Sequence, residues 1–113
     1  MRLVGFVIAM IALPSAALAD AAAIGIGVQN CSQLSKDFGN DAVKADLAYT
    51  NWAFGFLSGV NLAFEVAGKT RRNLTAMSFE DKKAYLRSYC DRNPAKTPMD
   101  GAVEMYGKMD VFK

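Results

Sequence analysis

The sequence contains no histidine, and this absence excludes several kinds of chemistry. Without an imidazole the chain cannot form a Ser-His-Asp or Cys-His nucleophile system, a histidine-bearing zinc site or a switch that titrates at about pH 5–8. Its 13 basic and 11 acidic side chains give a net charge of +2, too small to indicate a nucleic-acid partner. No segment matches a phosphate-binding loop. We therefore expect a protein that is not an enzyme and has no cofactor or metal.

The chain of 113 residues also lacks a long apolar segment. Its most apolar run, Leu3 to Leu13, is about half of the roughly 20 residues that cross a bilayer. Arg2 precedes the run and Ala17-Leu18-Ala19 follows it, an arrangement typical of a secretory signal peptide and its cleavage site. We expect residues 1–19 to be a cleaved signal peptide, with a retained anchor as the alternative. The mature chain, residues 20–113, is then one domain in the periplasm, without stable membrane insertion.

Cysteine is scarce, since only Cys31 and Cys90 are present. In an oxidising compartment two lone cysteines usually pair with each other. A redox or nucleophilic thiol is less well supported, because the chain has neither a Cys-x-x-Cys motif nor a histidine that would activate the sulfur. The sequence therefore predicts a Cys31–Cys90 disulfide that closes a loop of about 60 residues and stabilises the fold.

The hydrophobic pattern predicts an all-α fold, a single bundle of three to four helices tied by this disulfide, and no β-strand. Helix caps and breakers set the expected boundaries. In chain order we expect a loosely ordered tail (20–29), a short helix or turn (30–34), a turn (38–41), a long helix (42–67), a polar connector (70–76), a helix that Ser78 caps and Asn93-Pro94 ends, and a last helix that Thr97 caps.

The long helix has two features that predict how it packs. Its apolar residues cover a wide arc, which is typical of a central helix packed on more than one side. Gly55, Gly59 and Ala63 share one face at a spacing of four residues. Glycine costs about 1 kcal/mol relative to alanine inside a helix, so we expect another backbone of the same molecule to approach this face closely.

Two pairs of charged residues are candidates for binding or catalysis. Arg71 and Arg72 would suit a phosphate or an acidic partner. The alternative is a pair of solvated arginines in a polar loop. Glu80 and Asp81 have the side chains that general acid–base catalysis needs, but their place at a helix N-terminus favours helix capping. Neither pair therefore establishes a reaction.

Three features resemble a known group of proteins. They are Cys31, the run from Trp52 to Asn61, and the ending Tyr89-Cys90-Asp91-Arg92-Asn93-Pro94 followed by a short amphipathic helix. Together they resemble small exported helical proteins of proteobacteria, in and around the HdeA/HdeB acid-stress chaperone family. They are also similar to the Tai-type immunity proteins that neutralise cell-wall amidases. The first resemblance implies that Cys31 and Cys90 form a disulfide that clamps the ends of the helical core.

The resemblance to the chaperones implies a non-enzymatic periplasmic binding protein that opens in acid and holds unfolding clients. Without residues 1–19 the chain has 12 basic and 11 acidic side chains. Protonation of the carboxylates at about pH 4 and below leaves the basic groups unopposed, and their repulsion loosens a compact fold. We expect Trp52, Phe54, Phe56 and Phe64 to contact the client. The alternative is an immunity or inhibitor protein that blocks an exported cell-wall hydrolase. A homodimer is compatible with both functions.

Overall fold

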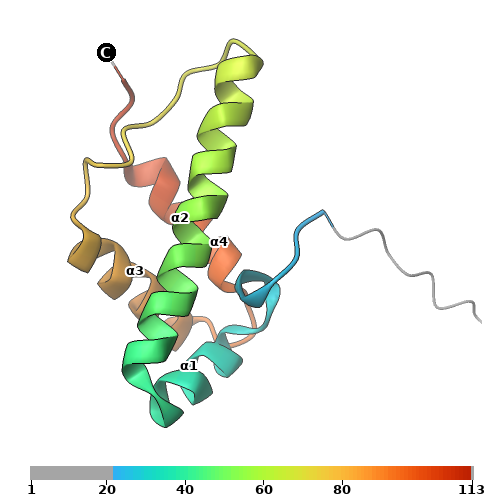
Figure 1. Cartoon of the computed structure of the whole chain (residues 1–113), viewed down its shortest axis with the longest axis vertical. Helices are drawn as coiled ribbons and strands as arrows, with labels where there is room; N and C mark the ends of the chain where they lie inside the picture. The colour runs from blue at the N-terminus through green and yellow to red at the C-terminus, as the bar shows by residue number, and fades with distance from the viewer. Residues whose placement is uncertain (1–21, 113) are drawn as a thin grey trace, which may run out of the picture.

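Four α-helices and one short 3-10 turn make up the computed structural model, which describes residues 22–112 (Figure 1). The elements are η1 (Ile26–Val28), α1 (Cys31–Asn40), α2 (Ala42–Val66), α3 (Phe79–Arg92) and α4 (Pro98–Lys108). Within the described residues there is no β-strand, and an isolated antiparallel bridge joins Arg72 to Val111. The predicted all-α fold is therefore confirmed. The predicted signal peptide, residues 1–19, lies outside the described residues.

The helix caps are formed by the residues that the sequence indicated. The Asp41 carboxylate accepts a hydrogen bond from the Lys44 amide at 3.1 Å, and the Ser78 hydroxyl accepts one from the Asp81 amide at 3.1 Å. Thr97 and Asp100 form a full capping box at the start of α4. Each cap stabilises its helix by about 1 kcal/mol. The boundaries of α2 and α3 and the start of α4 consequently lie within one or two residues of those predicted.

The first helix is longer than predicted, because the sequence indicated only a short helix or turn over 30–34 followed by a turn at 38–41. In the structure α1 continues to Asn40. Leu34 is 1% exposed, and the Arg87 guanidinium of α3 lies 4.3 Å from the centre of the Phe38 ring. Contacts with α2 and α3 therefore stabilise a helix that local sequence pattern indicates only weakly.

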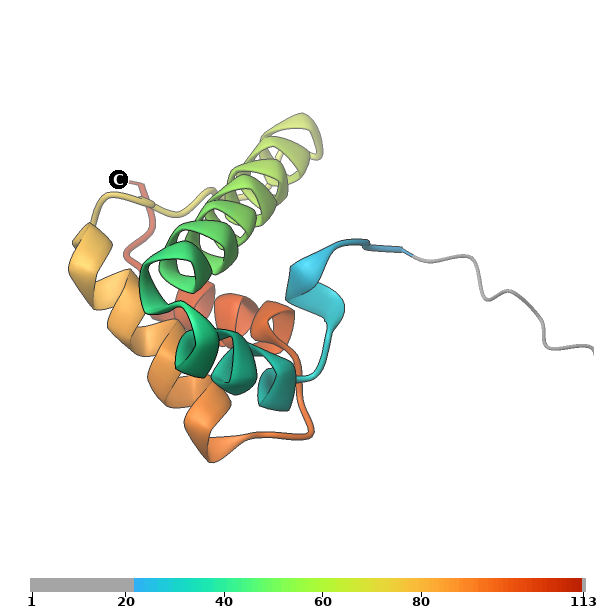
Figure 2. The ribbon, with the colours of Figure 1, turned by 60° about the horizontal axis from the view of Figure 1, so that its bottom comes forward.

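Helices α1, α3 and α4 pack against the same side of α2 (Figure 2). Their buried side chains form two clusters. One lies among α2, α3 and α4, and its buried members are Ala53, Leu57, Leu86, Ala102, Met105, Tyr106 and Met109. The other surrounds the disulfide between α1, α2 and α3, and its buried members are Cys31, Leu34, Ala45, Tyr49, Tyr89 and Cys90.

The segment predicted to be a loosely ordered tail, residues 20–29, is packed against the bundle over its described part. Its turn η1 contacts both α2 and α4. The Trp52 indole N–H donates a hydrogen bond to the Ile24 carbonyl at 3.0 Å, and Gly27 is buried against the indole. These residues therefore lie on Trp52, and the expectation that the tail is loosely ordered stays a prediction.

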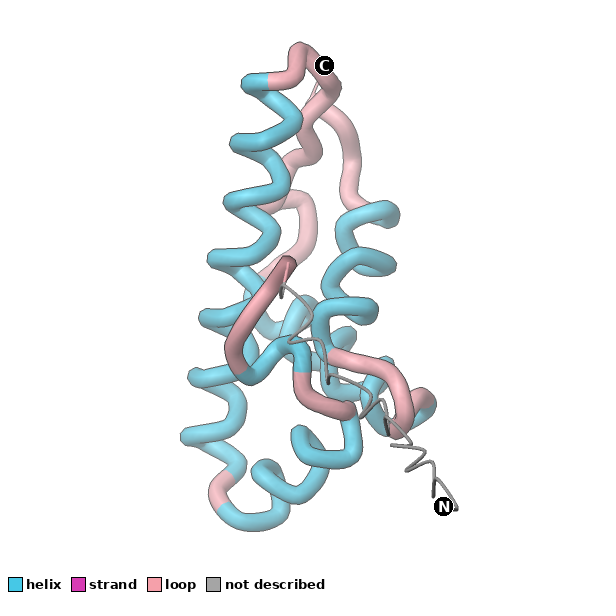
Figure 3. The backbone as a smooth tube through the Cα atoms, turned by 90° about the vertical axis from the view of Figure 1, so that its right-hand side faces the viewer, coloured by secondary structure: helices cyan, strands magenta, loops and turns pink. Residues whose placement is uncertain are grey.

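The predicted close approach of another backbone to Gly55 and Gly59 does not occur. A Cβ atom added at either glycine would meet nothing within 4 Å, and Ala63 is also exposed. Helix α2 is therefore packed on one side, and the opposite side is open to solvent (Figure 3). We call this side the outer face of α2. Its residues are Lys44, Leu47, Ala48, Asn51, Gly55, Ser58, Gly59, Leu62, Glu65 and Val66, all exposed.

Candidate functional site

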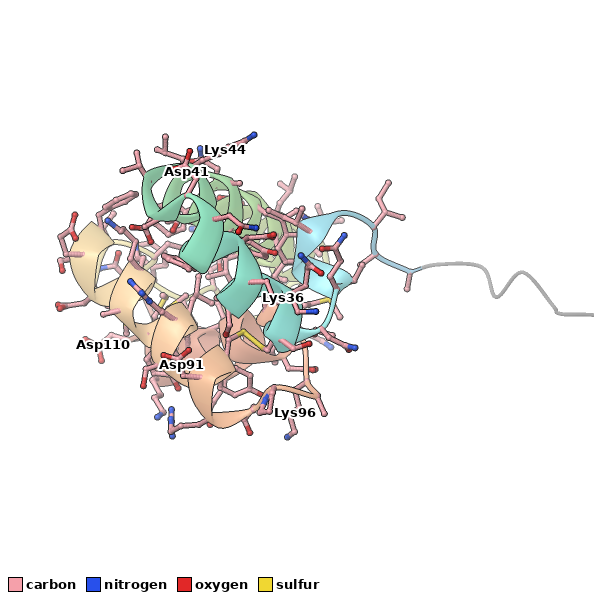
Figure 4. The ribbon with its side chains drawn as sticks, turned by 90° about the horizontal axis from the view of Figure 1, so that it is seen from below. Lys36, Asp41, Lys44, Asp91, Lys96 and Asp110 are labelled. Atoms are coloured by element: carbon pink, nitrogen blue, oxygen red, sulfur yellow. A yellow bond between two sulfur atoms is a disulfide. The ribbon has the colours of Figure 1, made fainter. Side chains whose placement is uncertain are left out.

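The predicted disulfide between Cys31 and Cys90 is present, with the two Cα atoms 4.7 Å apart. Both residues are 0% exposed. The bond joins the first residue of α1 to α3, and it is seen from below the bundle in Figure 4. Next to it, the amide of Cys31 donates a hydrogen bond to the Lys96 carbonyl in the loop before α4. The disulfide therefore fixes the start of α1 against the end of α3 and the following loop.

The four aromatic residues predicted to contact a client are all half-buried. The rings of Trp52 and Phe56 stack on each other with centroids 5.3 Å apart. Phe54 packs edge-on against Phe79 of α3. Phe64 packs edge-on against Tyr106 of α4. Each ring therefore has an aromatic neighbour in the folded chain, and Trp52, Phe56 and Phe64 also pack against the buried cluster among α2, α3 and α4.

Trp52 is covered by the residues that precede α1. Besides the hydrogen bond to Ile24, the backbone of Gly25 and Gly27 lies directly on the indole, where an added Cβ would be 2.7 Å and 2.1 Å from ring atoms. Gly25 has φ +104°, a conformation that side-chain-bearing residues rarely adopt. Only glycine therefore allows this segment to lie on Trp52.

Two adjoining hollows lie beside Ser58 of α2, between this helix and the connector that leads to α3. One is lined by Phe54, Leu57, Ser58, Leu74, Thr75 and Lys82. The second is lined by Ser58, Asn61, Leu62, Glu65, Arg71, Asn73, Leu74, Thr75 and Phe112. Phe112 is 51% exposed and Leu62 61% exposed at the rim of the second hollow. This region and the outer face of α2 share Ser58 and Leu62, and together they expose apolar surface.

Three polar contacts between helices each depend on a carboxylate. The Tyr49 hydroxyl of α2 donates a hydrogen bond to Asp37 of α1 at 2.6 Å. The Tyr85 hydroxyl of α3 donates one to Glu104 of α4 at 2.7 Å. The third contact is an ion pair between Lys83 of α3 and Asp46 of α2, 3.4 Å apart. Every helix of the bundle takes part in at least one of these contacts.

The first of these contacts perturbs the pKa values of both partners. Hydrogen bonds from Tyr49 and then from Gln33 lower the pKa of the Asp37 carboxyl below its ordinary value. Burial, followed by the hydrogen bond to Asp37, raises the pKa of the Tyr49 hydroxyl. Both shifts favour the hydroxyl–carboxylate pair near neutral pH. The tyrosine is neutral in this state, and its hydrogen bond to the carboxylate joins α1 to α2.

The two arginines of the connector bind within the molecule. Arg71 forms an ion pair with Glu65 at 3.3 Å. Arg72 donates to the Met109 carbonyl at 2.7 Å, and its guanidinium lies 5.6 Å from the centre of the Tyr106 ring. Both side chains therefore have partners in the chain, which argues against the phosphate grip and also differs from two merely solvated arginines.

Asn61 is a positioning residue that the sequence reading did not identify. Its amide oxygen accepts hydrogen bonds from the Arg72 amide at 3.1 Å and from the Tyr106 hydroxyl at 2.7 Å. Its amide nitrogen donates to the Arg72 carbonyl at 2.8 Å. Asn61 thus attaches the connector to both α2 and α4. In the sequence, the signal for Asn61 is a polar residue within the long helix. In the structure this residue is half-buried.

Residues 22–112 contain no cluster of three or more His, Cys, Asp or Glu side chains suited to a metal ion. None of the helices there combines the length and apolar character needed to cross a membrane. Glu80 and Asp81 lie in the first turn of α3, where the Asp81 amide takes part in the cap.

Comparison of the chain with protein-family models, with curated proteins and with solved structures found no match.

Proposed function

We propose that this protein is a non-enzymatic binding protein of the periplasm that opens in acid and holds unfolding client proteins. The observation that carries the proposal is that three polar contacts between helices each include a carboxylate. Asp37, Asp46 and Glu104 each join one helix to another, and no buried side-chain nitrogen or oxygen among the described residues lacks a partner. Protonation of carboxylates therefore acts directly on how the helices are held together.

Acid affects these contacts in one direction. Carboxylates in general protonate at about pH 4 and below. The contact between Asp37 and Tyr49 is lost at a lower pH than this, because hydrogen bonds from Tyr49 and Gln33 lower the pKa of Asp37. The basic side chains keep their charge, so the chain becomes strongly cationic and self-repulsive. Separation of the helices then uncovers Trp52, Phe54, Phe56 and Phe64, which the neutral structure keeps half-buried. These aromatic rings supply the apolar area that binds an unfolded chain.

The disulfide limits how far this opening proceeds. Because Cys31 and Cys90 join α1 to the end of α3, the loosened chain still forms a closed loop that contains all of α2. The aromatic residues of α2 consequently stay close together in the open state. Neutralisation restores the carboxylate contacts and allows the bundle to close again.

Light scattering by an acid-labile enzyme of unrelated sequence tests this proposal. Equimolar mature protein should suppress aggregation of the enzyme at about pH 2–3 and have no effect at pH 7. Phe54→Ser and Phe64→Ser should weaken suppression, whereas Val103→Ser, which changes an apolar residue on the exposed side of α4, should not. Equal scattering with and without the protein at low pH would refute the chaperone role.

A pull-down at pH 7 separates this role from the alternative one. An immunity or inhibitor protein should recover one tightly bound cell-wall hydrolase from an envelope extract at neutral pH. Recovery of such a partner, together with no suppression of aggregation in acid, would assign the inhibitor function instead.

A further inference from the structure

The two adjoining hollows beside Ser58 differ in how their charged side chains are paired. The larger hollow contains Glu65 and Arg71, which form an ion pair with each other. The smaller hollow contains one charged side chain, Lys82. Its ammonium group lies 4.8 Å from the centre of the Phe54 ring, and none of the ion pairs among the described residues includes it. The smaller hollow therefore offers a positive charge that has no acidic partner in the described part of the chain.

The remaining lining of the two hollows is rich in apolar side chains. These are Phe54, Leu57 and Leu74 in the smaller hollow, and Leu62, Leu74 and Phe112 in the larger one. The hollows have volumes of about 150 Å³ and 430 Å³, so together they fall within the roughly 300–1,000 Å³ of small-molecule sites. From Phe54 to Leu62 the helix rises about 12 Å at 1.5 Å per residue. This shape suits a linear apolar chain with an anionic group at the end that carries the ammonium.

We propose that the two hollows together bind a small linear carboxylate with a hydrocarbon chain, such as a medium-chain fatty acid. The carboxylate accepts a hydrogen bond from the ammonium of Lys82, a charge-assisted contact that is stronger than a neutral one. The hydrocarbon chain lies over Leu57 and Leu74 and extends toward Phe112. This inference goes beyond the proposed function, because it concerns the folded chain at pH 7 and needs neither acid nor a client protein.

The hydroxyl groups in the hollows favour a hydrocarbon chain over a peptide. Ser58 donates its hydroxyl proton to the Phe54 carbonyl at 2.7 Å, and Thr75 donates its own to the Asn73 side chain at 2.7 Å. A hydroxyl group has a single proton to donate. The carbonyl groups of a bound peptide would therefore find no hydroxyl donor here, and a buried carbonyl without a partner costs free energy. A saturated chain has no polar group that needs one.

Isothermal titration calorimetry of the mature protein with decanoate at pH 7, below the concentration at which decanoate forms micelles, measures the binding. We expect a dissociation constant on the order of 100 μM, which is ordinary for a ligand of this size. Decylamine has a chain of the same length and a positive charge, so it should bind at least about tenfold more weakly. Equal affinity for the two ligands, or no binding of decanoate up to about 1 mM, overturns the proposal.

Charge reversal at the ammonium tests the orientation of the ligand. Lys82→Glu should reverse the preference, so that decylamine binds more tightly than decanoate. The change places a negative charge near the N-terminus of α3, which favours the helix, and circular dichroism checks that the fold is kept. Lys96→Glu is the matched control for net charge, because Lys96 lies in the loop before α4 and lines neither hollow (Figure 4). A preference that stays with decanoate in Lys82→Glu, or that reverses equally in Lys96→Glu, refutes this site.

Nuclear magnetic resonance of ¹⁵N-labelled protein locates the ligand. Decanoate should shift the amide signals of Ser58, Leu74 and Thr75 and leave those of α1 unchanged, because α1 lines neither hollow. Shifts confined to residues outside the two hollows would assign the binding to another surface and overturn the proposal.

Discussion

Removal of the Cys31–Cys90 disulfide should lower the free energy of unfolding by roughly 4 kcal/mol. The two residues are 59 positions apart in the chain, so the bond closes a long loop in the unfolded state. In the chain-entropy model a loop of about 60 residues has this stabilising value at 25 °C. A small domain has a total stability of about 5–15 kcal/mol, so the bond contributes a large share of it.

The folded state should change much less than the unfolded state. Both sulfurs lie in the buried cluster with Leu34, Ala45 and Tyr49, where two alanine side chains can be accommodated with little movement. Native circular dichroism and the emission of Trp52, the single tryptophan of the chain, should therefore be unchanged in the double variant Cys31→Ala/Cys90→Ala. The main effect is then on the unfolded chain, which becomes less compact.

Equilibrium unfolding in urea measures the effect. Oxidised wild type, reduced wild type and the double alanine variant should be compared by circular dichroism and by Trp52 emission. The loss of roughly 4 kcal/mol corresponds to a fall of the urea midpoint by roughly 1–4 M. The dependence of unfolding free energy on urea should also become steeper, because the uncrosslinked chain exposes more surface.

Two results would refute this reasoning. A loss below about 1 kcal/mol in both the reduced protein and the double variant would show that the bond does not restrict the unfolded chain as the structure implies. A native tryptophan emission that differs between the oxidised protein and the double variant would show that the bond is needed for the folded arrangement itself.

The remaining predictions concern three other contacts. Asn61→Leu removes two hydrogen bonds with the backbone of Arg72 in the connector and one from the Tyr106 hydroxyl of α4. This change should cost about 2–4 kcal/mol in urea unfolding, whereas Asn51→Leu on the exposed side of α2 should cost less than about 1 kcal/mol. Equal losses would contradict the role of Asn61. Gly27→Ala places a Cβ 2.1 Å from the Trp52 ring and should displace the segment before α1 that covers this ring. A red shift of the tryptophan emission would report the displacement. Gly39→Ala is the control and should cause no shift, because an added Cβ there meets nothing within 4 Å. Asp37 has a lowered pKa in the folded protein, so its contact with Tyr49 stabilises the fold above the ordinary aspartate range and is lost as the pH falls through the lowered folded-state pKa. Tyr49→Phe should therefore flatten the acid limb of stability against pH, measured by thermal unfolding from pH 7 to pH 2, and Tyr89→Phe, which changes another buried tyrosine, should leave the limb as in wild type.

Most of the secondary structure could be predicted because its signals are local. Asp41, Ser78 and Thr97 are good N-cap residues, and each forms the expected hydrogen bond to an amide three residues later. The disulfide was also predictable, since two cysteines allow a single intramolecular pairing once oxidation is assumed. These predictions needed no knowledge of which helices are neighbours.

Predictions about faces and surfaces were less successful, because they depend on how helices are arranged. An apolar arc that extends around α2 is compatible with burial on two sides or with burial on one side and exposure on the other. The spacing of the glycines predicts a close contact with another backbone of the same molecule. The structure instead places Gly55 and Gly59 on the solvent-exposed side of α2. The roles of Asn61 and Asp37 were not predicted, because their partners Tyr106 and Tyr49 lie 45 and 12 positions away in the sequence.

The sequence by itself therefore determined the all-α class, the positions at which three helices begin, and the pair of cysteines that are joined. Each of these results from interactions within a few residues or from a count of residue types. Tertiary structure alone decided the length of α1, the packing of residues 24–28 on Trp52, the carboxylate contacts between helices and the open face of α2. These features depend on which surfaces are brought together in space, and an apolar or polar residue has the same local pattern whether its partner is a neighbouring helix or water.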